Sequence, residues 1–363
     1  MRKRSVRVCV TAGIVLSVVA LGLYRSPRIA LTVPSGPWGV GTALFQFDAG
    51  IPARTAVIAR LWYPAPPLTA GRHASYLYGV LGASLRDRLV TAVVSSQSII
   101  DAPVAVGRFP LVVYIPGAGG QLVNNSSLAQ ELASHGFVVA AIDDTRASIS
   151  IDFSSNEAIR RTKVHGERKV RLQAHDVLRL VDALQAAEAE PTGRFAGRID
   201  LQRVGVVGFS FGGAVAAQAA SMDSRIRGAV DLDGSVFGDA AAGGISKPFM
   251  LMIGAHETED TFEAAFDREN IAAAIHGMER HGGYVITVAD TEHYNFSDAA
   301  VLPTVRKTGL GSIDGRRGER IVAHYVLAFF NRWLRGEQQK VLDSRESFDR
   351  NVTSRSYGSL SSK

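Results

Sequence analysis

One serine of the chain lies between two glycines at a spacing that suits nucleophilic chemistry. The stretch from Arg203 to Ala216 reads RVGVVGFSFGGAVA, and Ser210 stands at the centre of its G-x-S-x-G pattern. An apolar run before the pattern predicts a strand and the small residues after it predict a helix, so Ser210 falls on the turn between them. Glycines two positions before and after it remove the bulk that so tight a turn excludes. The pattern predicts a serine nucleophile; the simpler alternative is a glycine-rich turn with an incidental serine.

A serine hydroxyl is a poor nucleophile at neutral pH, so it needs a base to take its proton and an acid to orient that base. Of the nine histidines, His256 and His293 follow Ser210 and come directly after a predicted strand. His293 follows the last of these strands and has Asp290 and Glu292 just before it. We expect His293 to be the base; the alternative for it is an exposed loop histidine without a role.

Two places in the sequence offer the acid. Asp233 ends the strand that follows Ser210, and Glu257 opens an acidic group after the next strand, with Glu259 and Asp260. Position at the strand ends favours the Glu257 group slightly. Asp231 lies two residues deeper in its strand, where an internally hydrogen-bonded carboxylate is the better interpretation. On the residues alone, the acid stays open between Asp233 and Glu257.

Acyl transfer also needs donors for the oxyanion of its tetrahedral intermediate. The backbone N–H of Phe211, the residue after the serine, is one candidate. The second is the N–H of Ala118, which lies in the glycine-rich loop PGAGG after the strand at 109–115.

The elements that position these residues alternate regularly. Apolar runs predict strands at 109–115, 137–142, 204–207, 226–232, 249–253 and 284–288. Helical periodicity lies between them, as in Val170, Ala174, Val177 and Val181. This alternation predicts an α/β fold, a mostly parallel central sheet with helices on both faces. In such sheets the reactive side chains gather at the carboxyl ends of the strands.

The sequence shows no break in composition from residue 38 to residue 335, which we interpret as one domain. Segments 38–47 and 54–64 predict an antiparallel hairpin at a sheet edge. Residues 65–107, with a weakly helical stretch at 81–94, are expected to form an insertion over the sheet. The tail 336–363 contains many serines and few apolar residues, so we expect it to be loosely ordered.

The first 30 residues differ from the rest. A basic start precedes 17 mostly apolar residues at 8–24, which is typical of a signal peptide or an N-terminal membrane anchor. We therefore expect the protein to be exported, either periplasmic or extracellular, or held at the membrane by residues 8–24. The single cysteine, Cys9, lies in this segment, so the body of the protein contains no disulfide.

The net charge of +6 belongs to the same segment. Six of the 40 Lys and Arg residues and none of the 34 Asp and Glu residues lie in the first 30 positions, so the remainder is balanced. The rest of the sequence has no row of clustered Lys and Arg residues and no recognisable nucleic-acid-binding motif. We therefore expect no nucleic-acid partner. This part of the sequence also has no ligand cluster or dinucleotide loop, so neither a metal nor an organic cofactor is implied.

The stretch GFSFGGAVAAQAASMDSRIRGAVDLDG, residues 208–234, resembles the plasma and intracellular type II platelet-activating-factor acetylhydrolases, a family of α/β-hydrolases. In that family the serine of the G-x-S-x-G turn, called the nucleophile elbow, is followed 23 residues later by the catalytic aspartate. Ser210 and Asp233 have the same separation. The similarity extends to LASHGFVVAAID, to YIPGAGG as the oxyanion loop and to EHYNFSD around the histidine, over roughly residues 38–335. The resemblance implies an α/β-hydrolase fold with Asp233 as the acid and Glu257 as second choice.

Two positions depart from the family. Phe209 and Pro116 stand where the family usually has histidines, in the elbow and at the start of the oxyanion loop. The triad is unaffected, but the substrate preference is open. Bacterial dienelactone-hydrolase-like and polyester-hydrolase-like enzymes share much of the same pattern.

These observations lead us to expect a serine-dependent carboxylic ester hydrolase that acts on short-chain acyl esters, resembling an esterase that removes the sn-2 acetyl group of a phospholipid. The alternatives are a general carboxylesterase or polyesterase, a dienelactone-hydrolase-like enzyme, or a non-catalytic, membrane-tethered binding protein of the same fold. The natural ester and the oligomeric state stay open.

Overall fold

The computed structural model describes residues 29–48, 50, 56–67, 69–143, 156–236, 238–240, 245–255, 262–302, 308–343 and 347–358. Residues 1–28 of the expected leader, 1–30, and the second-choice acid, Glu257, lie outside these ranges.

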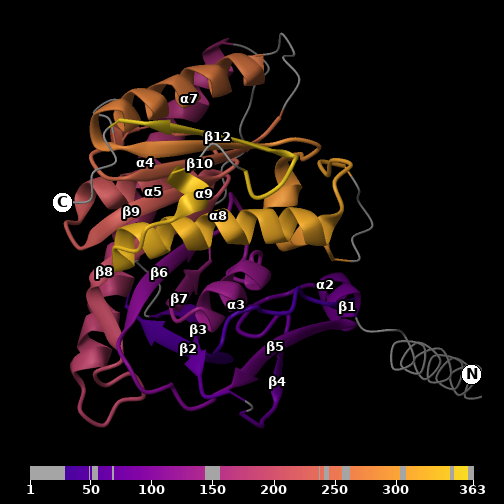
Figure 1. Ribbon diagram of the computed structural model, residues 1–363, viewed down its shortest axis with the longest axis vertical. Coiled ribbons are helices and arrows are strands. Elements are labelled where there is room, and N and C mark those ends of the chain that lie inside the picture. Colours follow the sequence, from indigo (N-terminus) through magenta and orange to yellow (C-terminus); the bar gives the residue numbers. More distant parts are fainter. Residues whose placement is uncertain are drawn as a thin grey trace, which may run out of the picture.

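A single sheet runs through the described part of the molecule (Figure 1). Its order is β1-β5-β2-β3-β7-β6-β8-β9-β10-β11-β12, and β4 pairs with β5 beside this path. The six strands from β7 to β11 in this order are parallel to one another, and β12 pairs antiparallel with β11. The strands are β1 (Ile29–Ala30), β2 (Gly39–Phe47), β3 (Val57–Ala65), β4 (His73–Ser75), β5 (Val94–Ile100), β6 (Phe109–Ile115), β7 (Val138–Ile142), β8 (Ile199–Phe209), β9 (Ile226–Leu232), β10 (Phe249–Gly254), β11 (Gly283–Val288) and β12 (Val352–Tyr357).

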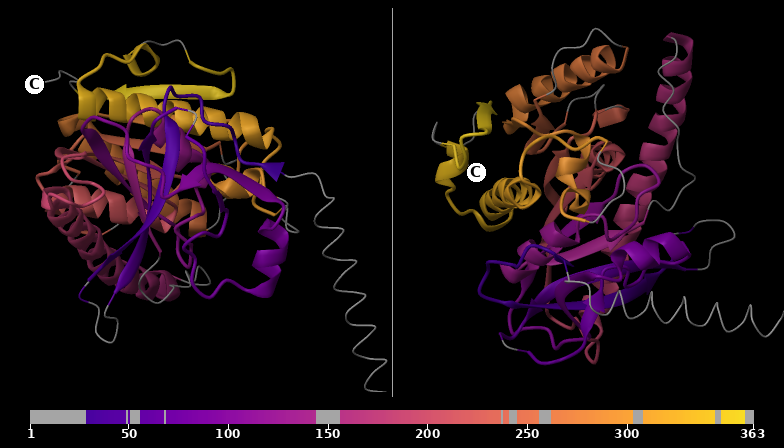
Figure 2. Two further views of the ribbon diagram at one scale, coloured as in Figure 1. Left: turned by 90° about the horizontal axis from the view of Figure 1, so that it is seen from below. Right: turned by 90° about the vertical axis from the view of Figure 1, so that its right-hand side faces the viewer.

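Helices cover both faces of the sheet. The long helix α4 and helix α8 lie on opposite sides of it (Figure 2). Buried residues of α4, α5 and α7 form one core with the sheet, and those of α3 and α8 form the other. The helices are α2 (Leu85–Thr91), α3 (Ser126–Ser134), α4 (Asn156–Ala189), α5 (Phe211–Met222), α7 (Phe262–His281), α8 (Gly315–Arg335) and α9 (Lys340–Asp343), with two 3₁₀ helices, η1 (His293–Phe296) and η2 (Asp298–Ala300).

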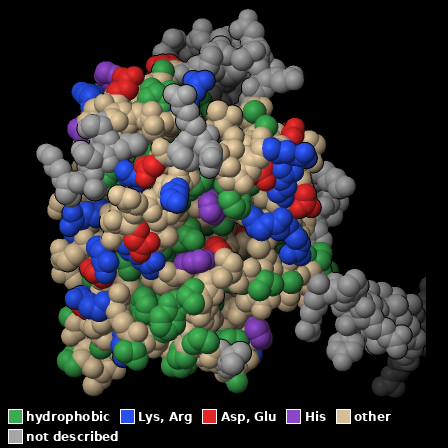
Figure 3. Space-filling view, in the orientation of Figure 1, with side chains coloured by type: hydrophobic (Ala, Val, Ile, Leu, Met, Phe, Trp, Pro, Cys, Tyr) green, Lys and Arg blue, Asp and Glu red, His purple; other side chains and the backbone are tan. Residues whose placement is uncertain are grey.

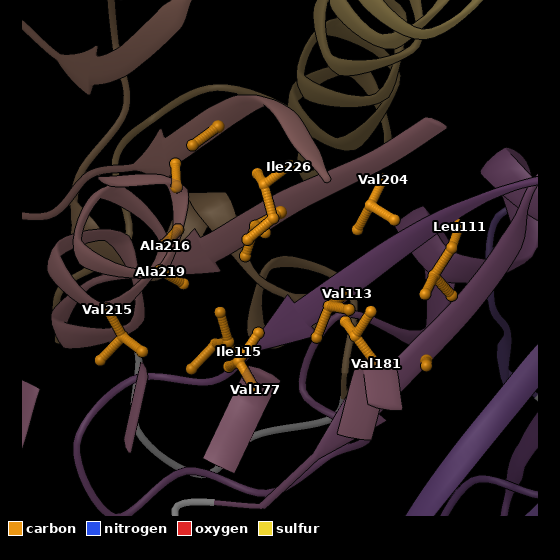
Figure 4. Packing of buried hydrophobic residues seen from close by; sticks show 14 of the residues in the cluster. Leu111, Val113, Ile115, Val177, Val181, Val204, Val215, Ala216, Ala219 and Ile226 are labelled. Atoms are coloured by element: carbon orange, nitrogen blue, oxygen red, sulfur yellow. The ribbon is translucent and has the colours of Figure 1, made fainter. Parts of the chain in front are cut away.

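The predicted mostly parallel α/β sheet is confirmed, and its central strands show why. Every residue of β6, FPLVVYI, is buried, as expected of a strand covered by helices on both faces. Val113 and Ile115 of β6 point toward Val177 and Val181 of α4 (Figure 4). Each fully buried aliphatic side chain of this kind contributes roughly 1.5–3 kcal/mol.

The predicted hairpin is present as β2 and β3, but the prediction that it lies at a sheet edge is wrong. β2 also pairs with β5, and β3 also pairs with β7, so the hairpin lies inside the sheet. The segment 65–107 was expected over the sheet, and instead it extends the sheet through β4 and β5. The polar strand β5 is accommodated because Ser96 and Ser98 both donate hydrogen bonds to the Gln130 side chain of α3.

The tail is more ordered than its composition predicts. Its described residues include α9 and β12, and β12 pairs with β11 in unbroken register from Gly283–Tyr357 to Val288–Val352. Backbone hydrogen bonds along an edge strand do not depend on side-chain polarity, which is why a serine-rich sequence forms it. Among the residues that the structure describes, no helix combines the length and apolar character needed to cross a bilayer.

Candidate active site

Ser210 occupies the turn between β8 and α5 in a strained backbone conformation. Its φ is 55° and its ψ is −124°, a region that residues with a side chain rarely adopt. The turn is held by two backbone hydrogen bonds, from Ser210 N to the Leu232 carbonyl and from Gly213 N to the Ser210 carbonyl, both 2.9 Å.

The two glycines of the pattern are required by backbone contacts. A Cβ at Gly208 would lie 1.9 Å from the carbonyl oxygen of Gly212, and one at Gly212 would lie 2.3 Å from that of Ile115. Both contacts are with backbone, which has no rotamer to move. The sequence pattern is therefore the steric consequence of the sharp turn that presents Ser210.

Asp233 and His293 meet at the carboxyl ends of β9 and β11. The Nδ1 atom of His293 lies 2.7 Å from Oδ2 of Asp233, and the other carboxylate oxygen accepts a hydrogen bond from Gly254 N at 2.9 Å. The Asp233 side chain is 5% exposed and that of His293 is 37% exposed. A buried, doubly hydrogen-bonded carboxylate fixes the orientation of an imidazole whose other nitrogen faces away from it.

The loop that carries His293 is held by Asn295. Its side-chain oxygen accepts hydrogen bonds from Glu292 N at 2.9 Å and from Gly311 N at 2.6 Å. The ring of Phe209, the residue before Ser210, packs against the imidazole with centroids 4.8 Å apart. The imidazole is thus oriented by a carboxylate on its edge and by an aromatic ring on its face.

The oxyanion loop lies next to Ser210. A Cβ at Gly117 would lie 3.1 Å from Cβ of Ser210 and 3.3 Å from the Phe209 ring, so this glycine lets the loop approach the serine. Ala118 follows it and is exposed. Phe211 opens α5, and backbone N–H groups at a helix start favour anions.

The structure brings together the Asp233–His293 pair, and it places Ser210 beside the Phe209 ring that contacts His293. The Ser210 side chain makes no capping hydrogen bond to α5. In substrate-free enzymes the hydrogen bond between the nucleophile and its base is often long. The catalytic roles of the three residues stay predictions. Among the residues that the structure describes, no group of three or more His, Cys, Asp or Glu side chains has the arrangement of a metal site.

Two residues that join the histidine loop to α3 carry no catalytic signature in the sequence. Asn125 donates a hydrogen bond from Nδ2 to the Phe296 carbonyl at 2.7 Å, and its Oδ1 accepts one from the Tyr114 hydroxyl. Asp298 accepts hydrogen bonds from the backbone N–H groups of Ser126 and Ser127 at 2.7 and 3.1 Å. The EHYNFSD stretch contains Asp298, so the family resemblance is the signal that points to it.

Comparison with known proteins agrees with this geometry. The family model described as "Platelet-activating factor acetylhydrolase, isoform II" matches residues 188–352, which include Ser210, Asp233 and His293. The chain is an α/β-hydrolase related to these esterases. Its predicted resemblance to this family is confirmed, and these similarities show a carboxylic ester hydrolase. A second family model, "PET hydrolase-like", matches residues 98–258.

Individual relatives are distant. The platelet-activating factor acetylhydrolase of Cavia porcellus is 25% identical over 351 residues, which cover 84% of this chain and 78% of that protein. A probable 1-alkyl-2-acetylglycerophosphocholine esterase of Arthroderma benhamiae is 24% identical, covering 64% of this chain and 62% of that protein. The solved structure of a ferulic acid esterase from Streptomyces cinnamoneus superimposes with a TM-score of 0.72 at 26% identity, covering 90% of this chain and 99% of that one.

Proposed function

We propose that this α/β-hydrolase is a serine esterase in which Ser210 is the nucleophile, His293 the general base and Asp233 the acid that orients it. The observation that carries the proposal is the 2.7 Å contact between His293 Nδ1 and Asp233 Oδ2, next to the strained turn of Ser210. Because Asp233 engages Nδ1, the opposite nitrogen, Nε2, is left to accept the serine proton.

The reaction proceeds through an acyl-enzyme. Ser210 Oγ attacks the ester carbonyl carbon as His293 takes the hydroxyl proton, and the carbonyl oxygen becomes an oxyanion. When the tetrahedral intermediate collapses, His293 returns the proton to the departing alcohol, and the acyl group stays on Ser210. A water molecule, deprotonated by His293, then attacks the acyl carbon and releases the carboxylic acid and free Ser210.

The oxyanion is held by the N–H groups of Phe211 and Ala118 in this proposal. The first comes from the start of α5, and the second from the loop that Gly117 brings up to Ser210. Removing one such donor typically lowers kcat by a factor on the order of 10² to 10³.

The substrate that we propose is an ester with a short acyl chain, like the acetyl esters in the names of the relatives from Cavia porcellus and Arthroderma benhamiae. A second candidate is an ester with an aromatic acyl group. It is favoured by the aromatic rings around His293, where Phe209 is buried and Tyr294 is 47% exposed. The PET hydrolase-like match and the similarity to a ferulic acid esterase support this second candidate.

Two measurements test the proposal. Replacing Ser210 with alanine should lower ester hydrolysis on the order of 10⁴-fold or more while the protein stays folded, and it should abolish covalent labelling by a fluorophosphonate probe. Near-normal turnover by Ser210→Ala, or an unlabelled but folded wild type, would contradict it; the latter is the result expected of a non-catalytic binding protein. Turnover of an acetyl phospholipid, a simple butyrate ester, a feruloyl ester and polyester film then ranks the substrate candidates.

We also propose that residues 8–24 export the protein or hold it at a membrane. Strand β1 (Ile29–Ala30), which follows this segment in the sequence, pairs with β5, and the helix α2 before β5 exposes Leu85 and Leu89. Leucines spaced four residues apart form one apolar stripe. Fractionation of cells tests this: full-length protein recovered among the soluble cytoplasmic proteins would contradict it.

A further inference from the structure

A cavity of about 200 Å³ lies between α3, α8, the 3₁₀ helices η1 and η2, and the segment that follows β1. Its walls do not include Ser210, Asp233 or His293, so it is separate from the proposed active site. Figure 3 shows the face of the molecule that carries α8, where histidine and hydrophobic side chains lie together near the centre. The volume is far larger than one water molecule requires.

A buried carboxylate in the cavity wall has one oxygen without a hydrogen bond of standard geometry. Glu319 of α8 is 8% exposed, and its Oε2 accepts a hydrogen bond from the Thr32 hydroxyl. Its Oε1 is buried and receives no hydrogen bond of standard geometry from the described residues, and the nearby donor in the wall is the Ser127 hydroxyl, which interacts with the Glu319 carboxyl group. Buried acceptors in native proteins are nearly always satisfied, so this oxygen points to a hydrogen-bond donor that enters from the cavity.

The acidic side chains around Glu319 favour a cationic donor, and the arginines that act on its carboxyl group, Arg316 and Arg320, are both exposed. Asp298 also lines the cavity, is 2% exposed, and already accepts two backbone N–H groups. Glu131 lines the outer part and accepts hydrogen bonds from Ser35. The one arginine in the described lining, Arg320, is exposed at the rim. Burial lowers the pKa of His324, so this wall residue is neutral at physiological pH.

The remaining wall is apolar and favours an organic cation over a metal ion. Leu128 and Val322 are buried in it, and the Phe348 ring stacks on His324 with centroids 3.8 Å apart and an interplanar angle of 13°. A hard divalent cation takes six or more oxygen ligands. Glu319 offers one oxygen without a standard hydrogen bond beside hydrocarbon, which suits an ammonium group that carries a short alkyl chain.

We propose that this cavity binds a small organic ammonium ion, with its N–H groups donating to Glu319 Oε1 and its alkyl chain packed against Leu128, Val322 and Phe348. Burial favours the protonated form of Glu319 in the free protein, so binding of the ammonium ion is coupled to release of that proton to solvent. The bound charge then compensates the ionised Glu319 carboxylate, and the alkyl chain displaces water from the apolar wall. Binding at this site involves no ester hydrolysis, so this proposal does not depend on the proposed function.

Calorimetric titration of the full-length protein with butylammonium, butanol and butyrate at one pH and ionic strength tests the proposal. Butylammonium is expected to bind at least tenfold more tightly than the other two. Glu319→Gln keeps an acceptor for Thr32 but removes the charge, and it should weaken butylammonium binding at least tenfold. Glu337→Gln, the same change at an exposed position just after α8, should leave the affinity unchanged.

A second variant keeps the test decisive if Glu319→Gln does not fold. Ala323 lines the cavity on α8, and Ala323→Leu should abolish butylammonium binding by filling the space while all charges stay in place. Equal affinity for butylammonium and butanol, unchanged affinity in either cavity variant, or no butylammonium binding to the folded wild type would overturn the proposal.

Discussion

The ring of Phe209 lies against the imidazole of His293, with centroids 4.8 Å apart and an angle of 31° between the planes. Phe209 is 4% exposed, so its ring cannot swing away without disturbing the core around it. The residue before the proposed nucleophile thus orients the proposed base. We interpret Phe209 as a positioning residue, because its ring contacts the imidazole and not the reacting atoms.

Replacing Phe209 with leucine should lower kcat for a p-nitrophenyl butyrate substrate by roughly 10- to 100-fold, since small displacements of a catalytic group carry costs of this size. The Michaelis constant should change much less, and Phe209→His, which restores a ring, should recover most of kcat. Phe330→Leu is the matched control, because it removes a buried ring from α8 that packs on Phe137 instead. A similar loss of kcat in both leucine variants would reduce Phe209 to a structural role.

The acid of the proposed catalytic triad can be identified by replacing the two candidate carboxylates, Asp233 and Glu257, one at a time. Asp233→Asn should lower kcat/KM for a simple ester by about 10⁴-fold, because an asparagine does not hold the imidazole in the required tautomer. Glu257→Gln, at the second-choice acid, should leave kcat/KM within about twofold, as expected for a residue outside the reacting groups. Steady-state kinetics on folded protein decides, and the reverse ranking would move the acid to Glu257.

The elbow glycines offer a test of the backbone argument. Gly212→Ala should destabilise the protein severely or prevent its folding, because the new Cβ would lie 2.3 Å from the Ile115 carbonyl oxygen. Gly318 in α8 is a control with room: its nearest neighbour would be Ile313 Cγ2 at 3.6 Å. Gly318→Ala should therefore stabilise the helix by about 0.5–1 kcal/mol. Thermal unfolding of both variants measures the contrast, and a fully stable Gly212→Ala protein would contradict the steric explanation.

The central fold was predictable because its signals are local. The buried strands β6 to β11 are short apolar runs, and the elbow needs glycine at fixed positions, so both features appear directly in the sequence. The edges of the sheet were not predictable in the same way. β12 depends on pairing with β11, and β5 depends on Gln130 of α3 to satisfy Ser96 and Ser98. Such long-range partners leave no periodic pattern in the strand itself.

The same distinction applies to the site. Ser210 and His293 could be proposed from their own neighbours, whereas strand-end position alone left Asp233 and Glu257 unresolved. The link between the histidine loop and α3 through Asn125 and Asp298 spans more than 170 residues of sequence, as the separation of 171 for Asn125 and Phe296 shows. A contact of this kind becomes visible only when the two segments are placed in space.

Asp298 also makes stability depend on pH. Burial raises its pKa well above the ordinary value, the nearby Glu319 raises it further, and burial also raises the pKa of Glu319. The folded state therefore keeps protons that the unfolded chain releases above about pH 4. Where the folded state binds more protons, the free energy of unfolding falls as pH rises, and below pH 4 both states are protonated and the penalty is absent.

Asp298→Asn should remove this penalty, since an asparagine keeps an acceptor for Ser126 N but does not titrate. Relative to the wild type, the variant should become more stable as pH rises from 4 toward 8. Asp239→Asn is a control with the opposite expected sign. The hydrogen bond from Arg171 lowers the pKa of Asp239, which is exposed. Relative to the wild type, this variant should therefore lose a small amount of stability as pH rises through about 4. Urea unfolding at a series of pH values measures both differences. Parallel curves for Asp298→Asn and the wild type would show that Asp298 is ionised in the folded protein.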